Sequence, residues 1–179
     1  MNTNKTFVKV GDRTVLRECV TVNCGTRDGE VTRIGSGCLI MAYCHVAHDC
    51  VLHDNIIMSN ATQVAGEVEI DSCAVIGGGS LIHQFSHIGS YVMIQGGTKV
   101  NKDVPPCVIA AHEPICFCGI NSVGLKRRGF DADQVARIQD VYRYLFMSDM
   151  NISQAIAYIE ANLPASNERE MIIGFIKAS

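Results

Sequence analysis

The sequence contains no segment suited to crossing a membrane or directing secretion. No stretch approaches the roughly 18 consecutive apolar residues of a membrane span. Residues 1–5 are polar and lack the apolar h-region of a signal peptide. We therefore expect a protein that has no membrane span and stays in the cytoplasm.

Charged residues are also scarce. They make up 18% of the 179 residues and the formal net charge is −3, so bulk charge does not indicate a nucleic-acid partner. The only dense basic run is Lys-Arg-Arg at residues 126–128, and a run this short is often a solvated surface feature. Apolar residues make up 47%, which argues against wholesale disorder.

Paired cysteine motifs are absent as well. The chain has nine cysteines, an odd and high number, but none of them form a Cys-x-x-Cys pair. The spacing typical of a cysteine zinc site is therefore missing. Free thiols in a reducing cytoplasm are the simplest interpretation.

What the sequence does contain is a repeat of six residues. Every sixth residue is aliphatic or methionine, and the same phase holds upstream at Val10, Leu16 and Val22. The phase fails at residue 28, inside residues 25–30, which we interpret as a loop that interrupts one coil. The twelve consecutive positions are Ile34, Ile40, Val46, Leu52, Met58, Val64, Ile70, Ile76, Ile82, Ile88, Ile94 and Val100.

A second position of mostly small residues recurs two residues before each of these, and it includes Cys38, Cys44 and Cys50. A large aliphatic and a small residue in every six are typical of a left-handed parallel β-helix built from hexapeptide repeats. Three hexads form one 18-residue coil of a triangular prism, with the aliphatic residue on the axis and the small one beside the turn. We expect these three cysteines to be packed thiols rather than metal ligands.

The repeat ends at Val104, Pro105 and Pro106, because proline cannot donate to a parallel ladder. Residues 107–124 are predicted to be an irregular or extended connection. Helical spacing begins after Asp131, a predicted N-cap.

Two further helices are predicted, at 153–162 and from about residue 166 to the C-terminus. The chain is thus expected to comprise a β-helix domain (1–106), a connecting segment (107–130) and a small α-helical domain (131–179). The flat parallel faces of such a prism also lead us to expect a homotrimer.

The best candidates for chemistry are histidines outside the apolar axis. His48 is followed by Asp49, a carboxylate able to orient an imidazole. Because residues 48, 66 and 84 are each 18 apart, His48, Gly66 and Gln84 should stack in one column. Two alternatives stay open: ordinary surface turn histidines, and a zinc site in which three histidines come from two subunits. The histidines concerned are His45, His48 and His83.

Several motifs together resemble the family of acyl-[acyl-carrier-protein]–UDP-N-acetylglucosamine O-acyltransferases. They are His-Val-Ala-His-Asp-Cys at 45–50, Asn-Ala-Thr at 60–62, Ala-Gly at 65–66, Ile-Gly-Gly at 76–78, His-Gln-Phe at 83–85, Asp-Val-Pro-Pro at 103–106 and Gly-Leu-Lys-Arg-Arg-Gly-Phe at 124–130. The resemblance covers nearly the whole chain. It implies transfer of a 3-hydroxyacyl group from acyl carrier protein to the 3-hydroxyl of UDP-N-acetylglucosamine, the first step of lipid A biosynthesis, without a cofactor or metal.

The resemblance also implies roles for particular residues. His48 would be the general base, Asp49 would hold its tautomer, and the Gly66 N–H would stabilise the oxyanion. Gly96 matches the position that sets acyl-chain length, and a glycine there favours a long chain. Positions near the sugar nucleotide, the reacting groups and the carrier are matched by His45, His83, Gln84, Asn121, Arg127 and Arg128.

Two departures from the family pattern qualify this expectation. Family members begin with several more coils before the stretch that corresponds to Val8, and they often have histidine where this chain has Glu67, so that Glu67 stands at a substrate-binding position. Two other functions therefore stay open. One is a trimeric, non-catalytic binding module of the same family that lacks the N-terminal coils, and the other is a zinc-dependent protein resembling carbonic anhydrase.

Overall fold

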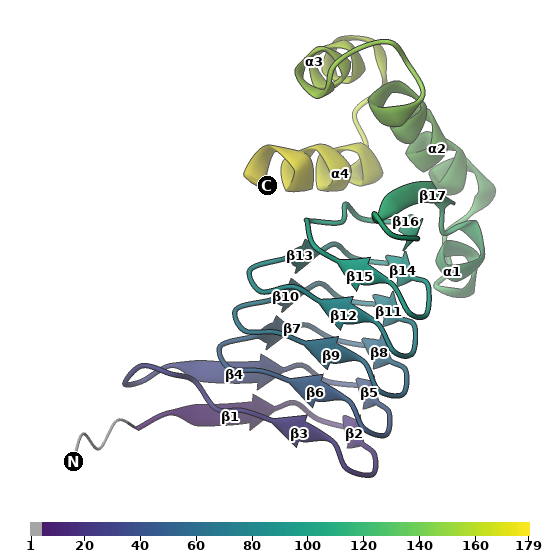
Figure 1. The fold of residues 1–179 in the computed structure, drawn as a ribbon. Coiled ribbons are helices and arrows are strands. Elements are labelled where there is room, and N and C mark those ends of the chain that lie inside the picture. Colours follow the sequence, from purple (N-terminus) through teal and green to yellow (C-terminus); the bar gives the residue numbers. More distant parts are fainter. Residues whose placement is uncertain (1–4) are drawn as a thin grey trace.

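A computed structural model describes residues 5–179 as a triangular prism of stacked coils with a group of helices at its C-terminal end (Figure 1). The polar segment 1–4 lies outside the described residues. The predicted left-handed parallel β-helix followed by a helical region is confirmed. Within residues 5–179 no helix has the length and apolar character needed to cross a bilayer.

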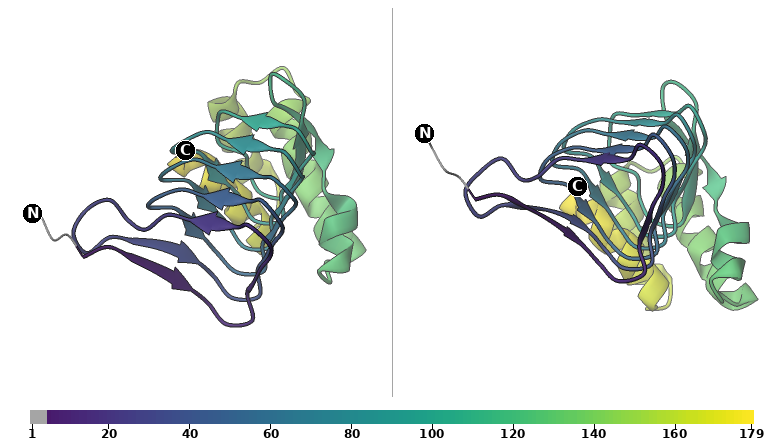
Figure 2. Two further views of the ribbon diagram at one scale, coloured as in Figure 1. Left: turned by 60° about the horizontal axis from the view of Figure 1, so that its bottom comes forward. Right: turned by 90° about the horizontal axis from the view of Figure 1, so that it is seen from below.

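Each side of the prism is one sheet of short strands, as the view from below shows (Figure 2), and we name the three sides faces A, B and C. Face A contains β1 (Phe7–Val10), β4 (Val31–Ile34), β7 (Val51–Leu52), β10 (Glu69–Ile70) and β13 (His87–Ile88). Face B contains β2 (Val15–Leu16), β5 (Leu39–Ile40), β8 (Ile57–Met58), β11 (Val75–Ile76), β14 (Met93–Ile94), β16 (Val108–Ala111) and β17 (Cys116–Ile120). Face C contains β3 (Thr21–Val22), β6 (His45–Val46), β9 (Gln63–Val64), β12 (Leu81–Ile82) and β15 (Lys99–Val100).

The strand register shows three coil lengths. Phe7 pairs with Val31, 24 residues on, because the predicted loop at 25–30 adds one hexad to the first coil. The middle coils have the expected 18-residue step. At the prolines the six-residue pattern ends as predicted, but the ladder continues, since Met93 pairs with Ile109 after only 16 residues.

The prism axis is filled as the repeat predicts. All twelve aliphatic or methionine positions from Ile34 to Val100 are at most 3% exposed. The thiols of Cys38, Cys44 and Cys50 are buried and donate to backbone carbonyls at 3.2, 3.1 and 3.0 Å. Burial raises the pKa of Cys50 to about 11, so the expectation of packed, protonated thiols is consistent with their surroundings.

The first coil differs from the rest because two of its three axial side chains are exposed, whereas Val22 is half-buried against the core. Val10 and Leu16, which continue the axial phase, are 44% and 42% exposed. Nothing among residues 5–179 packs against this end of the prism. Within residues 5–179 the apolar axis is therefore open at this end.

The corners need a backbone conformation that the repeat does not reveal. The second residue of most turns has a φ near +60°, although it is not glycine. Stacking must compensate for this conformation, which costs about 1–2 kcal/mol for each L-residue. Examples are Tyr43, Asp49, Asn55, Ala61, Glu67, Cys73, Phe85 and Tyr91.

Residues 107–124 are more ordered than the predicted connection. β16 adds to face B and turns back as β17 in an antiparallel hairpin, and α1 (Ser122–Arg127) follows. Sequence patterns missed this because the hairpin has no six-residue period and α1 has only six residues. The limits proposed for the domains remain predictions.

The three predicted C-terminal helices are confirmed. α2 (Ala132–Phe146) begins at Asp131, whose side chain accepts from Gln134 N in a capping box. The others are α3 (Ile152–Asn162) and α4 (Asn167–Ala178). The buried carboxylate of Glu168 binds Arg137 at 3.1 Å and thereby joins α4 to α2.

The helices also contact the prism directly. Buried Tyr142 of α2 donates its hydroxyl to the carbonyl of Pro106. On face A the ring of His87 lies 4.4 Å from that of Phe175 in α4. His87 Nε2 is 3.2 Å from Asp71 Oδ1 without hydrogen-bond geometry, so this contact is electrostatic when His87 is protonated.

Candidate functional site

The predicted column of His48, Gly66 and Gln84 lies at the corner between faces C and A. Glu67 N donates to His48 O at 3.0 Å, and Phe85 N donates to Gly66 O at 3.2 Å, so the three turns stack directly. The column is thus a consequence of the 18-residue coil.

His48 and Asp49 form the pair that their spacing predicts. His48 Nδ1 is 2.9 Å from Asp49 Oδ2, and the two side chains are 42% and 12% exposed. A carboxylate accepts a hydrogen bond, so Nδ1 carries the proton and Nε2 of the neutral ring keeps its lone pair. This arrangement allows Nε2 to accept a proton.

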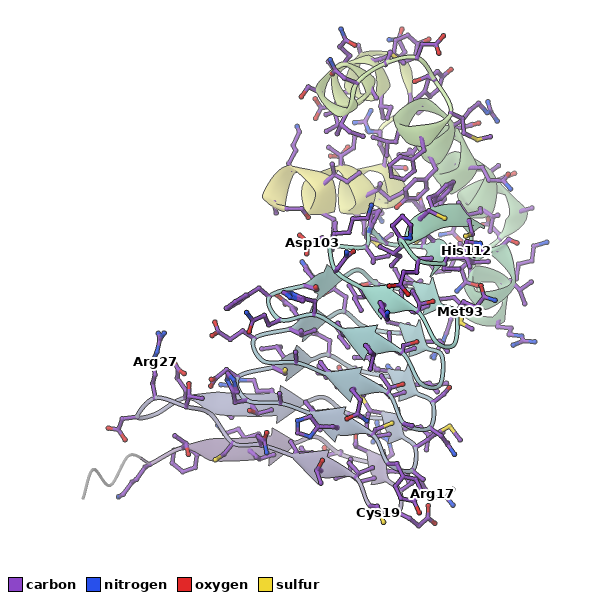
Figure 3. The ribbon with its side chains drawn as sticks, in the orientation of Figure 1. Arg17, Cys19, Arg27, Met93, Asp103 and His112 are labelled. Carbon is purple, nitrogen blue, oxygen red and sulfur yellow. The ribbon has the colours of Figure 1, made fainter. Side chains whose placement is uncertain are left out.

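The loop at residues 25–30 fixes Asp49, which sequence reasoning did not anticipate. Thr26 donates to Asp49 through its hydroxyl at 2.7 Å and through its backbone N–H at 3.1 Å. Burial alone would raise the pKa of Asp49, but the hydrogen bonds from Thr26 and His48 outweigh it and lower this pKa. The loop projects from the stacked coils, where Figure 3 labels Arg27. In the sequence, this loop is indicated only by the failure of the six-residue phase at residue 28.

Gly66 leaves room for the imidazole of His48. A Cβ at residue 66 would lie 2.5 Å from His48 Cε1 and 2.6 Å from Nε2. No acceptor within residues 5–179 receives a hydrogen bond from the Gly66 N–H. The N–H groups of His48 and Gln84 in the same column are equally free, so the distinctive property of Gly66 is the absence of a side chain.

A groove of about 640 Å³ lies on face C beside this column. His45 and His83 line it together with Gln84, whereas His48 lies at its margin outside the lining set. His45 Nδ1 is 2.8 Å from Thr21 Oγ1. At the far end Lys99 forms an ion pair with Glu113 at 2.8 Å. The remaining lining residues are Ala47, Gln63, Val64, Ala65, Leu81, Ile82, Val100, Asn101 and Pro114.

Glu67 lies on the other side of the column, toward face A. It is exposed and lines a separate hollow of about 340 Å³ with Arg27 and Glu30. Its carboxylate therefore does not line the face C groove.

The residues expected to bind nucleotide and carrier lie at a different corner, between faces A and B. The Asn121 side chain accepts from Gly124 N at 3.1 Å and donates to Tyr91 O at 2.9 Å. Arg128 Nη2 donates to Asn55 O at 3.3 Å, and Arg127 is exposed at the end of α1. Asn121 thus caps α1 and ties it to the prism. One chain does not bring these residues to His48, because the width of face A separates the two corners.

Gly96 lies at the third corner, between faces B and C, and is exposed. A Cβ there would lie 3.1 Å from Gly78 O, so only a small shift would admit a side chain. Gly96 does not line the groove of its own chain. Its proposed influence on chain length remains a prediction.

The three histidines considered for zinc do not come together in one chain. Two groups of potential metal ligands occur within residues 5–179, and neither contains His45, His48 or His83. One group is His53, Glu69 and Asp71; the other is His112, Cys116 and Cys118.

Comparison with known proteins gives one consistent family. The family model described as "Udp N-acetylglucosamine O-acyltransferase; Domain 2" matches residues 103–179. A curated relative from Herminiimonas arsenicoxydans, named acyl-[acyl-carrier-protein]–UDP-N-acetylglucosamine O-acyltransferase, is 42% identical over 91% of this chain and 63% of its own length. A relative of the same name from Anaeromyxobacter dehalogenans (strain 2CP-1) is 39% identical over 97% of this chain and 68% of its own.

Solved structures agree with the sequence comparison. The UDP-N-acetylglucosamine acyltransferase of Bacteroides fragilis superposes with a TM-score of 0.95 at 43% identity, over 98% of this chain and 69% of that one. The chain therefore spans about two thirds of the length of the relatives it matches, and slightly less for the Herminiimonas protein.

Proposed function

Because the chain belongs to the family of acyl-[acyl-carrier-protein]–UDP-N-acetylglucosamine O-acyltransferases, we propose that it transfers a 3-hydroxyacyl group from acyl carrier protein to the 3-hydroxyl of UDP-N-acetylglucosamine. This reaction would be the first step of lipid A biosynthesis, carried out in the cytoplasm. The observation that carries the proposal is the His48–Asp49 pair, with its imidazole directly over Gly66. The thioester donor is already activated, so the reaction needs no cofactor.

The mechanism assigns one step to each of these residues. His48 Nε2 takes the proton from the sugar 3-hydroxyl while the hydroxyl oxygen attacks the thioester carbon. Asp49 stabilises the resulting imidazolium. The Gly66 N–H donates to the oxyanion of the tetrahedral intermediate. When the intermediate collapses, the C–S bond breaks and the carrier thiolate takes the proton back from His48. The products are the ester and the free thiol of the carrier.

The groove on face C supplies a place for the reacting groups beside that pair. Its floor combines short apolar side chains such as Ala47 and Ala65 with the polar side chains of His45, His83 and Gln84. Apolar walls with a few polar groups suit an acyl chain that ends in a polar thioester. Glu67 lies on the opposite side of the column, so we expect it to face the solvent-exposed side of the bound sugar nucleotide.

We further propose that the active unit is a homotrimer. His48 and Gly66 lie at one corner of the prism, whereas Asn121, Arg127 and Arg128 lie at another. Six extended residues separate the corners by up to roughly 20 Å. Three prisms around a common axis would place the second corner of one chain beside the first corner of its neighbour. The guanidinium groups would then face the phosphates of the nucleotide or the carrier.

The test is acyl transfer by the purified chain from 3-hydroxyacyl carrier protein to UDP-N-acetylglucosamine. Replacing a general base lowers turnover about 10²–10⁴-fold, so His48→Ala should reduce kcat by that factor. His53→Gln, on face A, changes an exposed histidine outside the column and should retain activity. If wild type and His48→Ala are both folded and trimeric but neither transfers the acyl group, the enzyme proposal fails for this chain. Carrier binding without turnover would then favour the non-catalytic binding module.

A mixing experiment tests the trimer separately. His48→Ala and Arg128→Ala, each inactive alone, are refolded together. If sites form between chains, about one quarter of them contain both intact residues. Recovered activity near that fraction supports shared sites. No recovery, with mixed trimers present in native mass spectra, would refute the arrangement.

A further inference from the structure

The hairpin of β16 and β17 carries a cluster of histidine and cysteine that the proposed acyl transfer does not use. His112 begins the turn after β16, and Cys116 and Cys118 lie two residues apart on β17. Figure 3 labels His112 where the prism meets the helices. All three side chains are exposed.

The strand alternation explains why both thiols point to the same side. Neighbouring side chains on a strand face opposite ways. Phe117, between the two cysteines, packs its ring 5.5 Å from Tyr142 and 5.0 Å from Phe146 in α2. The thiols of Cys116 and Cys118 therefore face away from the helices.

The geometry matches the demands of a tetrahedral zinc ion. With Zn–S bonds of about 2.3 Å, two thiolates on one ion lie about 3.8 Å apart, and a thiolate and an imidazole nitrogen about 3.6 Å apart. Cys116 Sγ and Cys118 Sγ are 3.9 Å apart, and the three potential ligand atoms all lie within 4.8 Å of one another. Small side-chain rotations bring the imidazole into range. His112 adopts a φ of +75°, which turns it out of the strand.

The buried cysteines of the prism and the second group of potential ligands are less suited to a metal ion. Cys38, Cys44 and Cys50 are buried and each donates to a carbonyl. In the other group, His53 Nε2 lies 2.9 Å from Glu69 Oε1 and 3.9 Å from Asp71 Oδ1, so its ring is already paired with carboxylates. Only the hairpin group among residues 5–179 places two thiols side by side without a carboxylate between them.

We propose that His112, Cys116 and Cys118 form a site for one zinc ion, with the fourth coordination position open to water. Both thiols lose their protons to solvent on binding, so the two thiolates balance the charge of the ion. The ion would join the turn to β17. Glu113 and Pro114 of this turn line the groove on face C, so the bound ion would also fix one wall of that groove.

The test uses the metal-free, fully reduced 179-residue chain, titrated with Co²⁺ and then Zn²⁺. We expect one equivalent per chain, a sulfur-to-cobalt charge-transfer band that Zn²⁺ abolishes, and a rise in melting temperature with zinc. Cys116→Ser and Cys118→Ser should remove the band and weaken zinc binding at least 100-fold, and His112→Ala at least 10-fold. Cys19→Ser, which changes an exposed cysteine of the first coil, should leave all three signals unchanged.

Three outcomes would overturn the proposal. The first is the absence of a thiolate band in the reduced chain. The second is stoichiometric zinc that Cys116→Ser does not affect but His53→Gln removes, which would place the metal on face A. The third is a Cys116–Cys118 disulfide that persists under reductant, detected as a mass lower by two hydrogens. Circular dichroism of each variant separates loss of ligands from loss of fold, and none of these readouts depends on acyl transfer.

Discussion

Replacing Gly66 by alanine tests the position of His48, the proposed base, separately from the stability of the fold. The new Cβ would lie 2.5 Å from His48 Cε1, 2.6 Å from Nε2 and 3.1 Å from Nδ1. Since ordinary contacts need about 3.5 Å or more, the imidazole must move by about 1 Å. The His48 side chain is 42% exposed, so it can swing toward solvent while the prism stays intact. Its hydrogen bond to Asp49 is then lost.

The magnitudes follow from that displacement. Losing one side-chain hydrogen bond lowers the free energy of unfolding by about 1 kcal/mol. A base displaced by 1 Å lowers kcat by about 10² or more, up to the 10⁴ that general-base catalysis contributes. We therefore expect Gly66→Ala to fold almost normally and to lose nearly all turnover. The backbone N–H of residue 66 is retained, so the loss reports on His48.

The assay is steady-state acyl transfer combined with thermal unfolding, in a double-mutant cycle. In the His48→Ala background, Gly66→Ala should have no further effect on kcat, because the group it displaces is already gone. Gly174→Ala, where a Cβ meets no atom within 4 Å, is the control for adding a methyl group. Full activity of Gly66→Ala would refute the reasoning, as would equal additional losses in both backgrounds.

Two further predictions concern pH. Thr26→Val removes the hydroxyl that helps keep the pKa of Asp49 low. The stability that a lowered pKa contributes is lost as the pH falls through that pKa. Acid unfolding and the acid limb of the activity profile should therefore move to higher pH in this variant. An unchanged acid limb would contradict this. The Asp71 carboxylate raises the pKa of His87 against the effect of burial, with Glu69 and Asp103 adding to it. Stability from a raised pKa is present below about pH 6.5 and lost as pH rises through the raised value. The melting temperature of wild type should therefore fall across neutral pH more than that of His87→Gln, and parallel curves would refute the assignment.

The prism could be predicted from sequence because its cause is local and repeated. A coil with a single apolar axis requires one aliphatic side chain in every six residues, and Ile34 to Val100 meet that requirement without exception. The same regularity placed His48, Gly66 and Gln84 in one column. The helix starts were equally readable, since Asp131 caps α2 through contacts three residues away.

The contacts that shape the site were decided only by the tertiary structure. Thr26 reaches Asp49 across 23 residues, and the space above Gly66 is taken by His48 from the neighbouring coil. Such contacts depend on the path of a loop and on the directions that individual side chains take, which no spacing rule contains. The separation of Arg128 from His48 has the same origin, because the three-sided coil determines which residues share a corner. The sequence by itself therefore determined the prism and its candidate base, and the stacking of coils decided what orients that base and which residues lie at a separate corner from it.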